Sequence, residues 1–228
     1  MHTSDHPARR STAAALVITA LFVLTQLYSA IPLIGPVSTD LGRNATFALS
    51  TSFSLCYALG FLIWGPIADH YGRRTCLLIG MTLLTVATLS CAVTTSLGAL
   101  AVARCIQGIT AASFSPIALA YLSDSTPPAW RGTAIGAMST AFLVAGIFGQ
   151  VTAHAITERW GWHWVFGASA LVLFICAGAI AVLMRDRTTR TPYSSLIDQF
   201  ARVGALLTTP TILLLCSAHI TLLLVFVA

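Results

Sequence analysis

Seven long apolar runs, separated by short polar segments, restrict what this chain can fold into. Charged residues make up 8% of the 228 residues and hydrophobic residues 57%, and the mean hydropathy is +0.85. A helix needs about 20 apolar residues to cross a hydrocarbon core of roughly 30 Å. We therefore predict an all-α polytopic membrane protein. The predicted spans are Thr12–Ile34, Ala48–Ala68, Thr75–Thr94, Gly98–Leu122, Thr133–Ile156, His163–Met184 and Thr211–Ala228.

These runs divide the chain into four predicted parts. Residues 1–11 form an amino-terminal tail, 12–184 a six-span bundle, 185–210 a polar linker and 211–228 a seventh span. The last run reaches Ala228 without a flanking anchor, and this favours a chain cut inside a longer protein over one that ends naturally.

The arginines fall mainly on one side of the predicted membrane. Those expected there are Arg9, Arg10, Arg73, Arg74, Arg131, Arg185, Arg187, Arg190 and Arg202. The opposite loops hold Arg43 and Arg159, which are offset by Asp40 and Glu158. Because cytoplasmic loops are enriched in basic residues, we predict a cytoplasmic amino terminus, in a cell membrane that is expected to be the bacterial inner membrane. The net charge of +5 is then a topology signal, and no nucleic-acid partner is predicted.

Neither cysteines nor polar residues suggest a catalytic or metal centre. The six cysteines lie in or beside apolar runs, without a C-x-x-C pair or metal spacing to histidine. A membrane enzyme would need polar catalytic groups that converge inside the bilayer. No enzyme activity, cofactor or metal is predicted.

The most specific motif lies between the second and third runs. It reads Gly65-x-x-x-Asp69-x-x-Gly72-Arg73-Arg74. Gly65 is expected to let a neighbouring helix approach closely, and Gly72 to adopt the positive φ of a tight reversal. Asp69 and Arg73 can pair if the segment is helical. The motif resembles the loop between spans two and three of major facilitator superfamily transporters, which latches the cytoplasmic side; a loop that only sets topology is the alternative.

Arg104 is a charge inside the fourth run. Such a residue costs about 2.5–3.5 kcal/mol on insertion scales and normally faces a polar cavity or a partner; snorkelling to the interface is the alternative. Gln107 projects from the same helical face, and Gly108 and Ala112 have a spacing that admits another helix. The run resembles the fourth-span motif of the same superfamily, which links this arginine to proton coupling or substrate binding.

Two loop charges extend the resemblance. Asp124 and Arg131, between spans four and five, resemble the positions that pair with the first motif, so both motifs together would form a cytoplasmic gating loop. A bridge from Arg73 or Arg74 to Asp124 is expected, and two solvated charges are the alternative.

Spans one and five resemble exporters in part. The glycines of span five, Gly146 and Gly149 among them, partly match the glycine-rich exporter motif. Gln26 and Tyr28 resemble first-span positions of drug and sugar exporters. They are expected to line the substrate or proton pathway, with a plain helix interface as the alternative.

The resemblance implies the six-helix amino-terminal bundle of the major facilitator fold, with three-plus-three inverted repeats, and the start of a seventh span. It implies alternating access, in which the carboxy-terminal half or a second copy completes the cavity. We expect a proton-coupled antiporter for efflux of drugs or sugars. An importer of sugars or organic acids and a truncated, non-transporting half-carrier are the alternatives. The proton carrier is not assigned: Asp40 and Asp69 come nearest among the acidic residues, and a histidine or a residue of the other half are the alternatives to Asp40.

Overall fold

The structure is a computed structural model that describes residues 6–184 and a few separate positions between 204 and 218. Internal contacts distinguish two units, Met1–Thr189 and Arg190–Ala228, and the fold described below is that of the first. The predicted linker, 185–210, and the predicted seventh span, 211–228, lie almost wholly outside the described residues.

Six segments of the described part are helical, long and apolar enough to cross a membrane. They confirm the all-α prediction and the first six predicted spans. In chain order the elements are α1 (His6–Tyr28), α2 (Ala30–Asp40), the π-helical turn η1 (Phe47–Thr51), α3 (Ser52–Tyr71), α4 (Arg73–Ala92), α5 (Leu97–Ala111), α6 (Phe114–Ser125), α7 (Pro128–Trp160) and α8 (Trp162–Leu183). Helix α1 begins inside the predicted tail.

Three spans are irregular where the sequence suggested continuous helices. Span one breaks at Ser29, between α1 and α2, and span four breaks at Ala112, between α5 and α6. Pro32 and Pro116 follow these breaks. Proline lacks an N–H group and clashes with the carbonyl four residues earlier, so both breaks have a local cause. Span two instead begins with the π-turn η1, which contains no proline.

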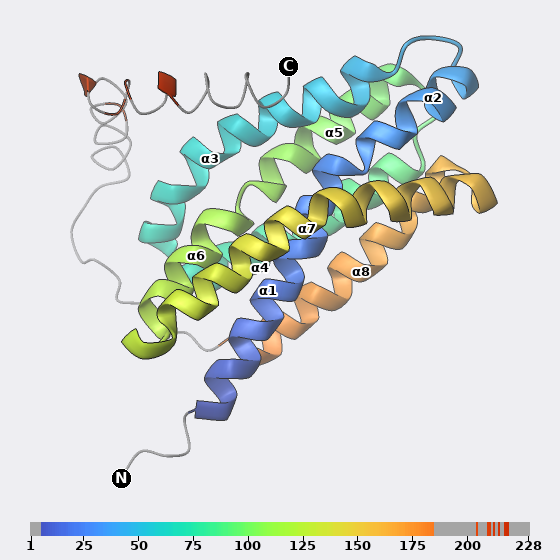
Figure 1. Cartoon of the computed structure of the whole chain (residues 1–228). Helices are drawn as coiled ribbons and strands as arrows, with labels where there is room; N and C mark the ends of the chain where they lie inside the picture. The colour runs from blue at the N-terminus through green and yellow to red at the C-terminus, as the bar shows by residue number, and fades with distance from the viewer. Residues whose placement is uncertain are drawn as a thin grey trace. The chain divides into compact units, whose positions relative to one another are not determined.

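The helices pack as an elongated bundle (Figure 1). Helix α1 lies against α7 and α8, α3 against α5, and α4 against both α5 and α8. One buried apolar cluster joins α1, α3, α4, α5, α6, α7 and α8, and a second joins α2, η1, α4, α5, α7 and α8. Large apolar side chains also cover the outside, for example Leu143, Ile147 and Val182. Such a surface suits a protein whose solvent is the bilayer.

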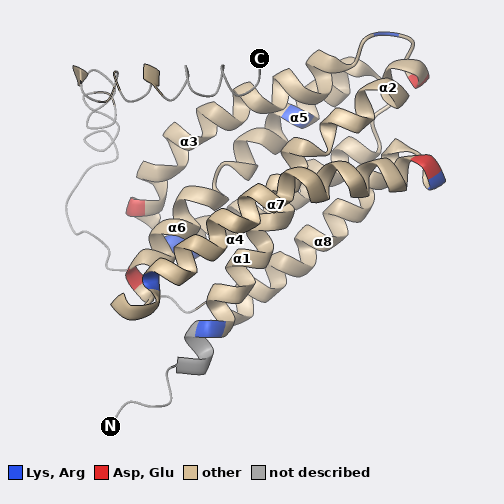
Figure 2. Cartoon of the chain, viewed as in Figure 1, with Lys and Arg blue, Asp and Glu red and all other residues tan. Residues whose placement is uncertain are grey.

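Charged residues gather at the two ends of the bundle, and one lies within α5 (Figure 2). The arginine-rich end comprises the start of α1, the α3–α4 junction and the α6–α7 junction, with Arg10, Arg73, Arg74 and Arg131. The opposite end carries Arg43 and Arg159. For the described arginines, the predicted partition between two ends is therefore observed. Which end is cytoplasmic stays a prediction.

Candidate functional site

Arg104 on α5 is completely buried, with an exposed fraction of 0%. Its Nε donates a hydrogen bond to the Leu49 carbonyl oxygen at 2.8 Å. Its Nη1 donates to the carbonyl oxygen of Gln26 at 3.0 Å and to Oε1 of Gln107 at 2.7 Å. The arginine therefore does not snorkel, and it has the partners that its burial requires.

The guanidinium charge is stabilised without a carboxylate. Among the described residues, the ion pairs do not include Arg104. Its Cζ lies 4.2 Å from the ring centroid of Phe53 and 5.8 Å from that of Phe166. Hydrogen bonds to charged groups contribute about 1.5–3 kcal/mol each and a desolvated cation–π contact about 2 kcal/mol. Together these exceed the insertion cost, although Nη2 is buried without a hydrogen-bond partner.

Gln107 extends this network to two other helices. Its Nε2 donates to Oγ1 of Thr88 at 2.8 Å and to Oε1 of Gln26 at 3.2 Å, and the Cys91 thiol lies 3.7 Å from its Oε1. Gln26 is 1% exposed and lies between helices of the bundle. Its place in the substrate or proton pathway stays a prediction. Sequence reasoning missed Thr88 and Cys91, because small residues in an apolar run carry no signal of their own.

Glycines allow α7 to lie close to α1. A Cβ added at Gly149 would be 3.2 Å from the carbonyl oxygen of Thr25, and one added at Gly146 would be 3.8 Å from the ring of Tyr28. Tyr28 is half-buried. Gly149 of the exporter-like motif thus has a packing role in this bundle, whereas a Cβ at Gly146 would make an ordinary van der Waals contact with Tyr28.

A second close approach joins α3 and α5. A Cβ at Gly108 would collide with the carbonyl oxygen of Phe53, and one at Gly60 would lie 2.6 Å from the Cβ of Ala112. The predicted packing role of Gly108 and Ala112 is confirmed. Among the described helices a Cβ at Gly65 would meet nothing within 4 Å, so the close approach expected there stays a prediction. Gly60, which the motif does not include, makes such an approach.

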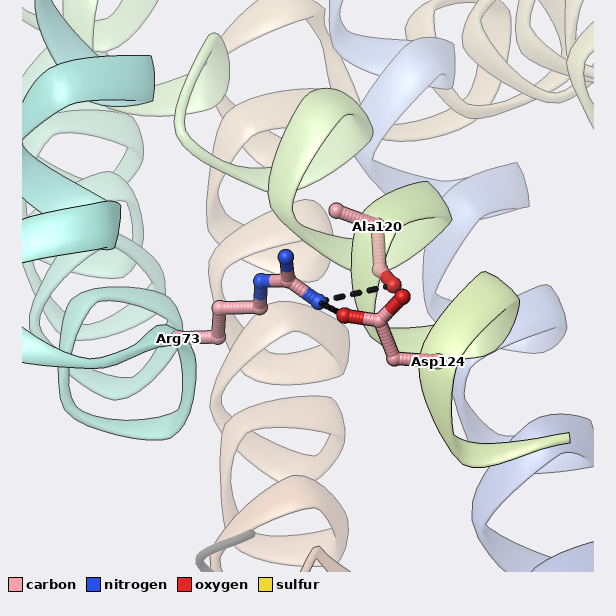
Figure 3. A network of polar contacts seen from close by, with 3 residues as sticks. All are labelled: Arg73, Ala120 and Asp124. Carbon is pink, nitrogen blue, oxygen red and sulfur yellow. Dashed lines mark hydrogen bonds and ion pairs between the residues drawn. The ribbon is translucent and has the colours of Figure 1, made fainter. Parts of the chain in front are cut away.

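Arg73 bridges the two loop motifs at the arginine-rich end. Its Nη1 donates to the Asp124 carboxylate and, at 2.9 Å, to the Ala120 carbonyl oxygen (Figure 3). Gly72 has the predicted positive φ, +95°. Because Gly72 also ends α3, Asp69 and Arg73 do not share a helical turn, and Arg73 reaches across to α6 instead of pairing within its own segment.

Arg74 points elsewhere. Its Nε donates to the Met184 carbonyl oxygen at 2.7 Å and its Nη2 to that of Ala181 at 2.8 Å. Oγ1 of Thr12 donates to the Leu183 carbonyl oxygen at 2.8 Å. The last carbonyls of a helix lack intrahelical partners. Arg74 and Thr12 therefore cap the end of α8, a role that the loop motif did not indicate.

The remaining charged candidates lie at the ends of the bundle. Arg131 is half-buried, and its Nε is buried without a hydrogen-bond partner. Asp69 is exposed at the arginine-rich end. Asp40, at the opposite end, accepts a hydrogen bond from the Trp162 indole at 3.0 Å. Asp69 lies in the last turn of its span, and Asp40 is the last residue of α2.

A sequence profile of the Major Facilitator Superfamily matches residues 16–228. The chain belongs to this superfamily. Solved structures support the same fold: a bacterial homologue of the human lysosomal transporter Spinster, inward-facing and unoccupied, aligns with a TM-score of 0.71 and 20% identity over 88% of this chain and 50% of that one. The peptide transporter POT, in complex with alafosfalin, aligns with a TM-score of 0.70 and 15% identity over 93% of this chain and 46% of that one.

Curated superfamily members are also similar in sequence. Multidrug resistance protein Stp of Mycobacterium tuberculosis (strain CDC 1551 / Oshkosh) is 31% identical over 174 residues, 74% of this chain and 32% of the relative. Multidrug resistance protein 3 of Bacillus subtilis (strain 168) is 31% identical over 133 residues, 58% of this chain and 26% of the relative. The chain thus spans about a third or less of these relatives. The predicted superfamily and its six-helix bundle are confirmed.

Proposed function

We propose that this chain supplies one bundle of a secondary transporter that works by alternating access. The observation that carries the proposal is the superfamily match across residues 16–228, on a six-helix bundle of the corresponding fold. In such carriers one bundle rocks against another around a site between them. The bundle is proposed to function in a lipid bilayer, with a carboxy-terminal bundle or a second copy as its counterpart.

The proposed cargo is a small organic molecule, and the proposed direction is export. Two relatives are named multidrug resistance proteins, and Gly146 and Gly149 of the exporter-like motif pack against α1. Tyr28 is half-buried and is proposed to contact the substrate. The side chains of Arg104, Gln107 and Gln26 are buried in the bundle. They are proposed to hold the helices that carry the substrate-contacting residues in place.

The arginine-rich end is proposed to be the cytoplasmic gate of the inner-membrane carrier. Arg73 and Asp124 hold the α3–α4 and α6–α7 junctions together there. Gly72 provides the reversal, and the exposed Asp69 and half-buried Arg131 are proposed to meet the opposing bundle. An exposed pair of this kind contributes about 0–1 kcal/mol, so it can open at little cost during a transport cycle.

Protons are proposed to drive the exchange. The test uses inverted membrane vesicles from cells that overproduce the native protein, with an imposed proton gradient and a fluorescent lipophilic dye. We expect dye to accumulate when the gradient is present, and a protonophore to abolish the accumulation. Vesicles that lack the protein are the control. Accumulation in right-side-out vesicles instead would indicate uptake, and no gradient-dependent movement in either orientation would refute transport of this class.

A further inference from the structure

Two irregular backbone segments on different spans share one side chain. The break between α1 and α2 follows the last turn of α1, where Gln26 lies, and the π-turn η1 contains Leu49. Arg104 donates from Nη1 to the Gln26 carbonyl oxygen at 3.0 Å and from Nε to the Leu49 carbonyl oxygen at 2.8 Å. The guanidinium therefore contacts the backbone of both spans where each departs from a regular helix.

Neither glycine nor proline accounts for the π-turn. The N–H of Ser52 bonds to the carbonyl oxygen of Phe47, five residues earlier, instead of the residue four earlier. The turn reads Phe-Ala-Leu-Ser-Thr, without glycine or proline. A side chain that inserts into the hydrogen-bond ladder is a recognised cause of such a departure. Two side chains donate to carbonyls inside η1: Ser52 Oγ to that of Ala48 at 2.8 Å, and Arg104 Nε, which comes from another span, to that of Leu49 at 2.8 Å.

We propose that Arg104 is a positioning residue, a buried clasp that ties the backbone of span one, beside its proline break, to the π-turn of span two. The planar guanidinium presents donors in fixed, diverging directions, which suits two carbonyls on separate helices. An ammonium group on a flexible stem does not have this geometry. This role differs from that of a proton relay, and it does not depend on the substrate, direction or coupling ion of the proposed transporter.

The clasp has a conformational consequence. A π-turn holds one more residue than the α-helical turn it replaces, and each residue of an α-helix turns by about 100° and rises about 1.5 Å. If Arg104 released Leu49 and η1 became regular, the segment before Ser52 would rotate by about that angle relative to α3. The clasp thus fixes which face of span two meets span one. π-turns are frequent at functional sites.

The same network offers a matched control. Gln107 accepts from Arg104 Nη1 at 2.7 Å and is itself anchored by Thr88 at 2.8 Å. Thr88→Val removes that anchor with little change in volume, but it leaves both contacts between Arg104 and the backbone carbonyls in place. An effect of the clasp can therefore be separated from an effect of the surrounding polar network.

The test is amide hydrogen exchange, followed by mass spectrometry, on the native protein in lipid nanodiscs. In Arg104→Gln we expect exchange to become at least about tenfold faster in residues 26–31 and 47–53, as follows from losing a hydrogen bond to a charged donor. Arg104→Lys should give an intermediate effect, and Thr88→Val should leave both segments unchanged. Unchanged exchange in both segments of Arg104→Gln, or an equal increase throughout the bundle, would overturn the proposal.

A second measurement on the unaltered protein covers the case in which Arg104→Gln does not fold. Solid-state nuclear magnetic resonance can measure the separation between ¹⁵N at Arg104 Nε and ¹³C at the Leu49 carbonyl in membranes. A separation that fits a direct hydrogen bond supports the clasp. A longer separation rejects it, whatever the variants do.

Discussion

At the scale of single residues, three arginines of this bundle show how environment decides what one side chain does. Arg104 is buried and bonded to neutral oxygens, Arg73 forms a partly exposed ion pair with Asp124, and Arg74 caps the end of a helix. The same guanidinium is thus a structural clasp, a candidate gate and a helix cap. Only its surroundings differ.

Removing the buried charge should destabilise the bundle. In Arg104→Met, the Leu49 carbonyl loses its charged donor, and the Gln26 carbonyl keeps the 3.3 Å bond from Ser29 Oγ. A buried group left unsatisfied costs about 1–3 kcal/mol. We expect a clear fall in the melting temperature of the purified protein, even though methionine suits an apolar interior better than arginine does. A melting temperature equal to that of the parent would mean that these contacts add no net stability.

Removing the ion pair should affect transport more than stability. The side chains of Arg73 and Asp124 are 27% and 63% exposed, so their pairing contributes about 0–1 kcal/mol. Asp124→Asn should leave the melting temperature nearly unchanged and lower the proposed dye export, because it weakens the gate. Normal export by this variant at normal membrane level would exclude the gating role.

At the scale of helices, close packing decides where glycine is required. Gly60 and Gly65 lie in the same helix, α3. A Cβ at Gly60 would meet Ile109 of α5 and the adjoining Ala112, whereas a Cβ at Gly65 would meet nothing within 4 Å. The sequence motif contains Gly65, and nothing local distinguishes the two positions. The distinction depends on Ala112 and Ile109, which are far away in the chain.

The two glycines form a matched pair for mutation. A Cβ at Gly60 would lie 2.6 Å from the Ala112 Cβ and 2.8 Å from the Ile109 carbonyl oxygen. Overpacking of this kind costs about 1–3 kcal/mol, so Gly60→Ala should unfold at a lower temperature. Gly65→Ala should be neutral or slightly stabilising, because alanine favours helix. Equal melting temperatures for the two variants would contradict this packing.

The end of α8 provides another prediction at this scale. Arg74→Gln removes donors from the carbonyls of Ala181 and Met184, whereas Arg73→Gln leaves them in place. We expect faster hydrogen exchange in the last turn of α8 for the first variant and not for the second. The same exchange rate in both variants would show that Arg74 does not cap the helix.

How far local sequence could predict the structure also becomes clear at this scale. Apolar runs identify the six spans, Gly72 identifies the reversal, and Pro32 and Pro116 account for two breaks. These features are predictable because each depends on residues that are close together in the sequence. The π-turn could not be predicted, since it contains no glycine or proline, and its contact with Arg104 comes from far along the chain. For the same reason, the burial of Gln26 and the capping by Arg74 required the folded structure.

At the scale of the whole molecule, the bundle has two ends of different charge, and this sets a topology that can be measured. We expect a cysteine at Asn44 to react with a membrane-impermeant maleimide in intact cells, and one at Thr126 to react only after the cells are permeabilised. The arginine excess at the second end is the physical reason. The native chain, with its own cysteines, supplies the background. The opposite labelling pattern would place the amino terminus outside.

The cap on α8 bears on how force passes through the molecule. Where the chain leaves this helix, Arg74 of α4 and Thr12 of α1 both hold its final carbonyls. Tension applied along the chain beyond Met184 would therefore be shared among three helices at once. This attachment opposes the separation of α8 from its neighbours. A force applied to the chain beyond Met184 would therefore displace α1, α4 and α8 together.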